Sequence, residues 1–208
     1  APSKSKSTAR ANGSNDDSST SRAEQFADLT PKERAKLYRG LTDLELQALE
    51  YDWQFWARPK QIAPPGDWTH WFIKSGRGFG KTRTAAEFVK ANIDNCGSWM
   101  FVGPTPRDVR DLMIEGESGL QSVFPPHQKP VYQPARMRVT FHNGATAFVR
   151  SAFDYESLRG PQFSGFWAEE VGIWKYPKQA WDNLMFGFRL PPFSRGVITS
   201  TPKPTWVV

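Results

Sequence analysis

The sequence has little of the chemistry that builds covalent frameworks or cysteine-based metal sites. Its 208 residues include one cysteine, Cys96, which excludes an internal disulfide framework and a cysteine-rich zinc site. The three histidines lack the spacing of zinc ligands. No apolar run approaches the ~18 residues of a membrane span, and no basic-then-apolar leader begins the chain. We therefore expect a soluble, cytosolic protein with no membrane partner.

Residues 1–22 also lack large apolar side chains. They contain no Val, Ile, Leu, Met, Phe, Trp, Tyr or Cys, and they are rich in serine. Such a segment cannot offset the entropy of ordering by burial, so we expect a disordered tail there. The chain as a whole is basic, with 27 Lys and Arg against 21 Asp and Glu, a formal net charge of +6. This excess suits an anionic partner, but it does not separate nucleic acid from nucleotide or membrane surface.

Helix-start signals follow the tail. Capping boxes begin at Thr30 and Thr42, the first with proline at its first helical position. They predict an N-terminal helical segment over residues 23–57, in which the second helix continues until Pro59 ends it. Trp56 falls on the apolar spacing of that second helix, and we interpret it as core packing.

Short apolar runs alternate with helical patterns through the rest of the chain. The predicted strands cover residues 71–73, 99–102, 138–141, 146–149, 163–168 and 196–199, and the main predicted helices cover residues 82–93 and 178–188. Asn143-Gly144 is a strong turn signal and predicts an antiparallel hairpin. The alternation predicts an α/β fold with a mostly parallel sheet flanked by helices.

Most of the functional information lies in one glycine-rich loop between a predicted strand and a predicted helix. Its residues are Ser75, Gly76, Arg77, Gly78, Phe79, Gly80, Lys81 and Thr82. Glycines let backbone N–H groups point at phosphate oxygens, and the helix N-terminus adds its dipole. We expect Lys81 to reach the β- and γ-phosphates and Thr82 to bind Mg²⁺. The usual pattern begins with glycine where this chain has Ser75, and an ordinary glycine-rich turn is the alternative.

A P-loop enzyme also needs carboxylates. Glu169 and Glu170 follow the apolar run 163–168, which predicts their place at the carboxyl end of a strand neighbouring the P-loop strand. Adjacent residues at a strand end point in different directions. We assign Glu169 to the metal shell, through water, and Glu170 to orienting the attacking water. A solvated acidic pair that caps a strand is the alternative.

Four stretches in this order resemble the ATPase half of the large terminase subunit of tailed bacteriophages, the motor that packages viral DNA. They are an adenine-side element from Trp56 to Trp68, a deviant P-loop from Ser75 to Thr82, a carboxylate motif from Leu158 to Glu170, and a coupling motif from Thr199 to Pro202. The resemblance implies an additional-strand, RecA-like P-loop NTPase domain over residues 58–208. A C-terminal nuclease domain, also implied for the family, lies outside this chain.

The resemblance also implies an activity and partners. They are hydrolysis of ATP with Mg²⁺, double-stranded DNA as cargo, a homo-oligomeric ring on the portal protein of the procapsid, a small terminase subunit, and the host cell cytoplasm as location. DNA-contact candidates are basic residues, each of which is by itself more readily a solvated surface charge: Arg107, Arg110, Arg136, Arg138 and Arg150.

The resemblance assigns further roles to matching positions. Gln61, helped by Arg58, would recognise adenine, with Trp56 either stacking on the base or packing in the helix core, and Arg77 would contact the γ-phosphate. Arg159 would be an arginine finger, acting in cis or across a subunit boundary, with a buried ion-pair anchor as the alternative. Thr199, Ser200 and Thr201 would sense the γ-phosphate, with a plain strand-to-turn exit as the alternative.

Two other functions remain open from the sequence. A helicase-like P-loop ATPase shares the upstream glutamine and the acidic doublet, whereas the arginine inside the P-loop favours a terminase. A ring-assembly or portal-docking module with little activity as a fragment belongs to another class. Nucleotide affinity with and without Mg²⁺ separates that module from the two enzymes.

Overall fold

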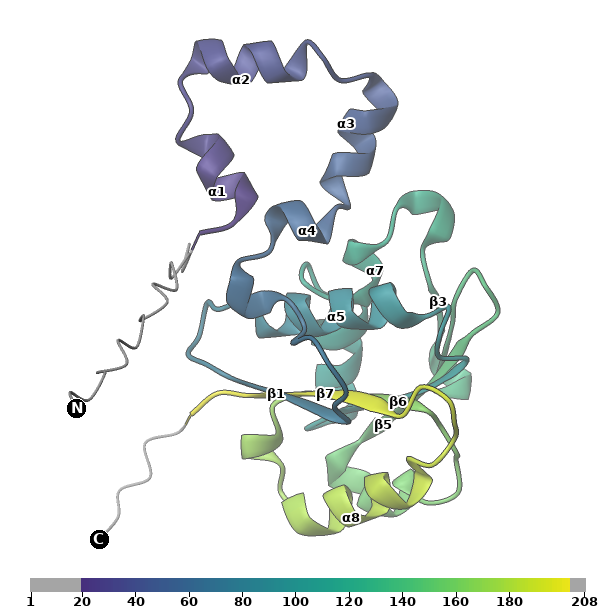
Figure 1. The fold of residues 1–208 in the computed structure, drawn as a ribbon. Helices are drawn as coiled ribbons and strands as arrows, with labels where there is room; N and C mark the ends of the chain where they lie inside the picture. The colour runs from purple at the N-terminus through teal and green to yellow at the C-terminus, as the bar shows by residue number, and fades with distance from the viewer. Residues whose placement is uncertain (1–19, 203–208) are drawn as a thin grey trace, which may run out of the picture.

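The computed structural model describes residues 20–202 of the chain (Figure 1). Most of the predicted tail therefore lies outside the described residues. Helical structure begins at Arg22, one residue before the predicted start, because Ser21 caps the first helix and forms a capping box with Glu24. Within the described residues, none of the helices combines the length and apolar character needed to cross a bilayer.

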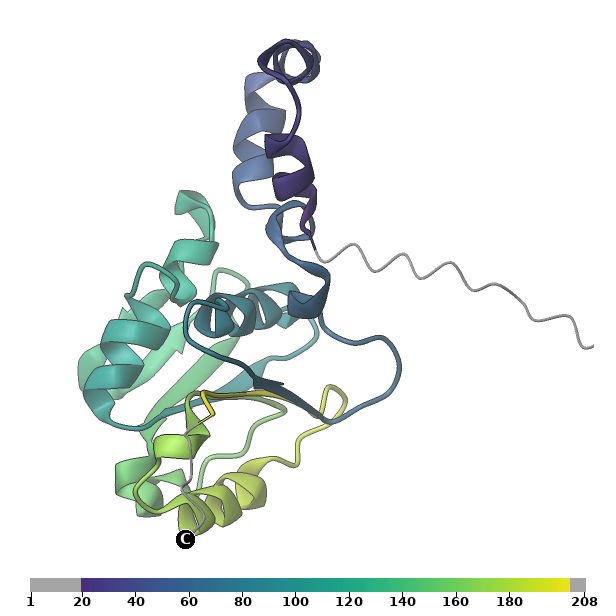
Figure 2. The same cartoon turned by 90° about the vertical axis from the view of Figure 1, so that its left-hand side faces the viewer.

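Four short helices form the N-terminal segment: α1 (Arg22–Ala27), α2 (Pro31–Tyr38), α3 (Asp43–Glu50) and α4 (Trp53–Trp56). The capping boxes at Thr30 and Thr42 are confirmed. The predicted continuous second helix is wrong, because Asp52 has an extended backbone and caps a new helix, α4. Trp56 is 47% exposed, so its interpretation as core packing is also wrong. Helices α2 and α3 extend away from the rest of the molecule (Figures 1 and 2).

A seven-stranded sheet forms the body in the order β1-β7-β6-β2-β5-β4-β3. Its strands are β1 (His70–Lys74), β2 (Ser98–Gly103), β3 (Val131–Gln133), β4 (Arg138–Thr140), β5 (Thr146–Ser151), β6 (Gly165–Ala168) and β7 (Arg195–Ser200). The five strands from β1 to β5 in this order are parallel, and the predicted hairpin joins β4 to β5 in antiparallel register. Strand β3, which the sequence analysis missed, adds a second antiparallel edge.

Helices cover both faces of the sheet (Figure 1). Helix α5 (Lys81–Asn92), the π-helix η2 (Val109–Ile114) and α7 (Leu120–Val123) cover one face, and α8 (Pro177–Gly187) and the 3₁₀-helix η5 (Ala152–Leu158) cover the other. Shorter elements are α6 (Pro106–Asp108), η1 (Pro59–Gln61), η3 (Pro126–Gln128), η4 (Pro134–Arg136) and η6 (Val171–Ile173). Strand β2 serves both layers, since Trp99 and Phe101 pack toward α5 whereas Met100 and Val102 pack toward α8.

The topology decides which loops meet. Parallel strands place their carboxyl ends at one edge of the sheet, so the loop after β1 and the residues after β6 and β7 converge there. Strand β7 lies between β1 and β6. The carboxylate strand is therefore one strand removed from the P-loop strand, and the prediction that the two are direct neighbours is wrong. The intervening strand is the additional strand that the resemblance implied.

Candidate nucleotide-binding site

The glycine-rich loop joins β1 to α5 and has backbone conformations that need glycine. Gly78 has φ +78°, and Gly80, the N-cap of α5, has φ +86°. A Cβ atom at Gly80 would lie 2.9 Å from the Gln61 side-chain nitrogen. The buried side chain of Gln61 therefore packs closely against the loop, while phosphate binding by the loop stays a prediction.

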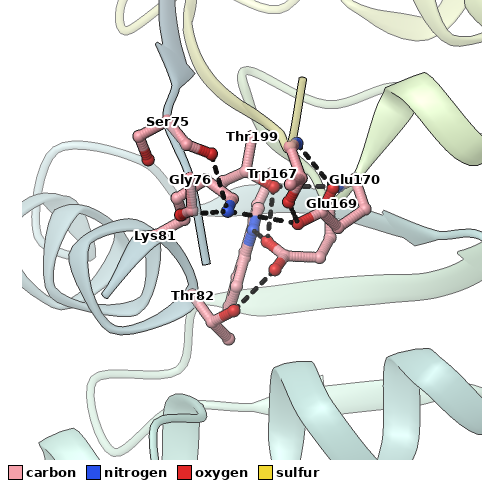
Figure 3. A network of polar contacts seen from close by, with 9 residues as sticks. Ser75, Gly76, Lys81, Thr82, Trp167, Glu169, Glu170 and Thr199 are labelled. Carbon is pink, nitrogen blue, oxygen red and sulfur yellow. Dashed lines mark hydrogen bonds and ion pairs between the residues drawn. The ribbon is translucent and has the colours of Figure 1, made fainter. Parts of the chain in front are cut away.

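Lys81 crosses from the loop to the carboxylate pair (Figure 3). Its Nζ donates to the backbone oxygens of Ser75 and Gly76 at 3.2 and 3.3 Å, and it lies 3.4 Å from Glu170 Oε1. The lysine side chain is 8% exposed. Ser75 Oγ is buried and has no hydrogen-bond partner in the described part of the chain.

Glu169 is a buried carboxylate with three donors (Figure 3). Its Oε1 accepts from the Thr82 hydroxyl at 2.6 Å, and its Oε2 accepts from Trp167 Nε1 at 2.7 Å and from the Thr199 hydroxyl at 2.9 Å. Burial raises the pKa of Glu169, and the three hydrogen bonds oppose that rise. The alternative of a solvated acidic pair is wrong for this residue.

Glu170 points elsewhere because its backbone is left-handed, with φ 48°. Its side chain accepts from Thr201, at 2.5 Å from the hydroxyl and 2.7 Å from the backbone N–H, and it forms the ion pair with Lys81. Burial alone would raise the pKa of Glu170, but the bonds from Thr201 and the charge of Lys81 outweigh it, and the pKa is lowered. The two neighbouring carboxylates thus have different environments.

The residues of the expected coupling motif contact both carboxylates and the loop. Thr199 donates to Glu169 and accepts from the Glu170 backbone N–H at 2.8 Å. Ser200 accepts from the Ser75 backbone N–H at 3.2 Å through its carbonyl oxygen. Residues 199–201 thus hydrogen-bond with both glutamates and with the start of the P-loop, and their role toward the γ-phosphate stays a prediction.

A cavity of about 610 Å³ opens beside these groups. Its lining is Arg77, Gly78, Gly80, Lys81, Thr82, Arg83, Ser118, Glu170, Ile173, Thr201 and Pro202. Three of the lining residues are cationic and one is acidic, a balance that favours a polyanionic ligand. Sequence reasoning missed Arg83, Ser118 and Ile173, and only Arg83, one residue past the loop, carried a local signal.

Arg58 and Gln61 contact the backbone of the loop and are not among the residues that line the cavity. Arg58 Nη2 and Gln61 Nε2 both donate to the Phe79 carbonyl, at 2.6 and 2.8 Å, and the Arg58 guanidinium lies 5.2 Å from the Phe79 ring centroid. The contacts make both side chains supports of the loop backbone. Their role toward adenine stays a prediction.

Arg159 lies apart from the cavity lining. Its Nε donates to Asn183 Oδ1 of α8 at 2.9 Å, and its side chain is 64% exposed. The alternative of a buried ion-pair anchor is wrong, since the nearest acidic partner, Glu156, is 4.0 Å away and itself exposed. Arg159 is not among the residues that line the cavity, and its role as an arginine finger, in cis or across a subunit boundary, stays a prediction.

The donor set fits Mg²⁺. Within residues 20–202, no group of three or more His, Cys, Asp or Glu side chains is placed to hold a metal ion. The oxygens that face each other are the Thr82 hydroxyl and the Glu169 carboxylate. Mg²⁺ uses one or two protein oxygens and takes its remaining ligands from phosphates and water.

Comparison with known proteins identifies relatives of this fold. A family profile described as terminase large subunit, T4likevirus-type, N-terminal matches residues 72–206. Among curated proteins, none matches the chain. The large terminase ATPase domain of Thermus phage P74-26 is 19% identical over 64% of this chain and 59% of that chain, with a TM-score of 0.45. A point mutant of that domain is 21% identical over 66% and 61%, with a TM-score of 0.43.

The large terminase of a thermophilic bacteriophage, solved in complex with ADP, is 16% identical over 74% of this chain and 37% of that chain, with a TM-score of 0.50. The chain thus spans less than two thirds of each of these structures. The seven-stranded sheet with helices on both faces matches terminase ATPase domains and confirms the predicted RecA-like P-loop fold. The family match covers residues 72–206, well over half of the chain, and the chain therefore belongs to the N-terminal family of T4likevirus-type terminase large subunits.

Proposed function

We propose that this chain is the ATP-hydrolysing motor domain of a phage large terminase, which drives double-stranded DNA into the procapsid. The observation that carries the proposal is that two residues of the loop pair with the two glutamates beside one cavity. Thr82 Oγ1 lies 2.6 Å from Glu169 Oε1, and Lys81 Nζ lies 3.4 Å from Glu170 Oε1. Loop and carboxylates come from segments almost 90 residues apart, and phosphoryl transfer needs both.

In this mechanism the loop backbone and the N-terminus of α5 bind the phosphate chain, and Lys81 and Arg77 neutralise its terminal oxygens. Thr82 and Glu169 would hold Mg²⁺, which supplies charge neutralisation on the phosphate oxygens when bound. Glu170 orients a water whose oxygen bonds to the γ-phosphorus while the bond to the β–γ bridging oxygen breaks. The Glu170 carboxylate takes the proton of that water.

The ion pair between Lys81 and Glu170 must separate before this step. A γ-phosphate competes for Lys81, and its arrival frees Glu170 to turn toward water. Thr201, which holds both oxygens of Glu170, would report the change to β7. Residues 199–201 thereby couple the occupancy of the cavity to the rest of the motor.

Family membership supports the partners included in the proposal. They are a homo-oligomeric ring, the portal protein, the small terminase subunit and double-stranded DNA, in the host cell cytoplasm. If the chain drives DNA, added DNA should raise the rate of ATP hydrolysis. Rising salt should remove this stimulation, because binding to the phosphate backbone of DNA weakens as salt increases.

Binding and turnover of ATP by the chain test the proposal. Isothermal titration with ADP and ATP, with and without Mg²⁺, should show binding that Mg²⁺ strengthens, and phosphate release should follow with ATP. Absence of nucleotide binding in both conditions would leave a ring-assembly module as the better function. Strand separation by the full-length protein would favour a helicase instead.

A further inference from the structure

Arg83 lies in the same cavity, and the mechanism above gives it no part. It belongs to the first turn of α5, two residues after Lys81, and its side chain is 29% exposed. With Arg77 and Lys81 it supplies the cationic lining of the cavity. The N-terminal turn of a helix favours an anion by its free N–H groups and its dipole.

A buried carboxylate fixes the Arg83 guanidinium. Glu87, one turn further along α5, is 1% exposed in its side chain, and its Oε1 accepts from Arg83 Nε at 2.9 Å and lies 2.8 Å from Nη2. Its other oxygen lies 3.6 Å from Lys90 Nζ. Burial raises the pKa of Glu87, while Lys90 and Arg83 lower it. A buried carboxylate keeps its charge at this depth only with such partners.

The N-terminal helices complete the setting of Arg83. Its Cζ lies 5.8 Å from the ring centroid of Trp53 in α4, at cation–π distance. Lys90 Nζ donates to the Tyr51 carbonyl at 2.8 Å, which anchors the linker between α3 and α4 to α5. Glu87 thus holds one edge of the Arg83 guanidinium, and the Trp53 indole ring covers its face. Because the side chain is already ordered, binding a ligand would cost little conformational entropy.

We propose that Arg83 binds the phosphate chain of the nucleotide and that Glu87 is its positioning residue. The contacts with Glu87 use the Nε–Nη2 edge of the guanidinium, which leaves its remaining donors for a second anion. Arg83 lines the cavity from α5, and Glu170 is the acidic residue among the lining residues. The other charged residues of the lining are cationic, which favours an anionic ligand beside Arg83. This inference rests on the proposed nucleotide-binding function and adds a phosphate contact outside the glycine-rich loop.

Competition binding tests the inference on the whole chain. Unlabelled ADP and inorganic pyrophosphate would displace a fluorescent ADP analogue from wild type, Arg83→Gln, Arg83→Lys and the control Arg39→Gln, an exposed arginine on the C-cap of α2. Arg83→Gln should weaken both ligands about tenfold or more, since a charge-assisted hydrogen bond to phosphate is lost. Arg83→Lys should fall between, and Arg39→Gln should equal wild type.

The outcomes separate this inference from the function on which it rests. Wild type that binds neither ligand would overturn both. Wild type that binds ADP, together with an Arg83→Gln variant of equal affinity, would overturn the Arg83 contact alone. Loss of ADP affinity with unchanged pyrophosphate affinity would also overturn it, because the contact would then be to the nucleoside.

Glu87→Gln tests the positioning role. The variant should lose part of the pyrophosphate affinity, and adding it to Arg83→Gln should cost nothing further, because the two residues act through one contact. Losses that multiply in the double variant would show that Glu87 acts independently of Arg83. Circular dichroism of each variant confirms the fold, and if Glu87→Gln does not fold, the Arg83 variants still test the phosphate contact.

Discussion

The hydroxyl of Thr199 accepts a hydrogen bond from the backbone N–H of Glu170 at 2.8 Å. Glu170 follows β6 and has a left-handed backbone conformation. The same hydroxyl donates to Glu169 Oε2. One side chain at the end of β7 therefore fixes the backbone of one glutamate and the carboxylate of the other. A displacement of β7 changes both groups at once.

Thr199→Val keeps the shape of the side chain and removes both hydrogen bonds. We expect the free energy of unfolding to fall by about 1–3 kcal/mol, since a buried carboxylate loses a donor. Hydrolysis should slow while ADP affinity stays within a few-fold of wild type. Chemical denaturation and phosphate release measure the two effects, with Thr146→Val in β5 as the control. A variant with wild-type turnover would remove Thr199 from the coupling role.

Glu170→Gln keeps size and most hydrogen bonds but cannot accept a proton. ATP should still bind, and hydrolysis should fall by about 10²–10⁴-fold, the usual contribution of a general base. Titration calorimetry and single-turnover phosphate release measure the two quantities separately. An equal loss of binding would point instead to a structural role for the ion pair with Lys81.

The two glutamates should respond to pH in opposite ways. Folding raises the pKa of Glu169 above its ordinary value of 4.5. The contribution of Glu169 to folding stability is therefore fully present below pH 4.5 and is lost as the pH rises through the raised pKa. Glu169→Gln, which stays neutral, should unfold at a higher temperature than wild type at pH 7, and the gap should close near pH 4.

For Glu170 the sign is reversed. Its pKa is lowered, so its stabilisation is present above about 4.5 and is lost as pH falls through the folded pKa. Glu170→Gln should unfold at a lower temperature than wild type at pH 7 and approach it in acid. Thermal scans of both variants across pH 4–8 in the absence of nucleotide make the comparison, and shifts of the same sign would contradict it.

Lys81→Ala should abolish ATP turnover. The substitution removes the cation that joins the loop carbonyls to Glu170, and it takes the main positive charge from the phosphate position. Circular dichroism should show an intact fold, because the sheet contacts do not involve this side chain. Phosphate release near the wild-type rate would exclude the loop from the reaction.

Arg159→Ala tests whether Arg159 acts as an arginine finger across a subunit boundary. Arg159 is exposed and does not line the cavity of its own chain, and a finger that acts across a subunit boundary would let one variant subunit disable its neighbour's site. Mixed rings should therefore lose DNA-stimulated ATPase activity faster than the wild-type fraction declines. A linear decline would argue against action across a subunit boundary.

Local signals found most elements of the fold. The predicted strands at 99–102 and 196–199 correspond to β2 and β7, and the asparagine-glycine turn lies where β4 meets β5. The failures have physical reasons. Strand β3 has three residues and no alternation to detect, and the helix predicted to reach Pro59 breaks because Asp52 caps the chain locally.

The sequence by itself determined that a glycine-rich loop begins a helix and that two adjacent carboxylates follow a strand, because glycine content, helix starts and strand ends are local properties. Only the tertiary structure decided which side chains lie next to one another in the site. It inserted β7 between β1 and β6, which brought Thr199 against both glutamates. It placed Gln61 behind the loop and left Arg159 on the surface. Such relations depend on strand order and on which face of a helix is buried, and neither is encoded in the spacing of a few residues.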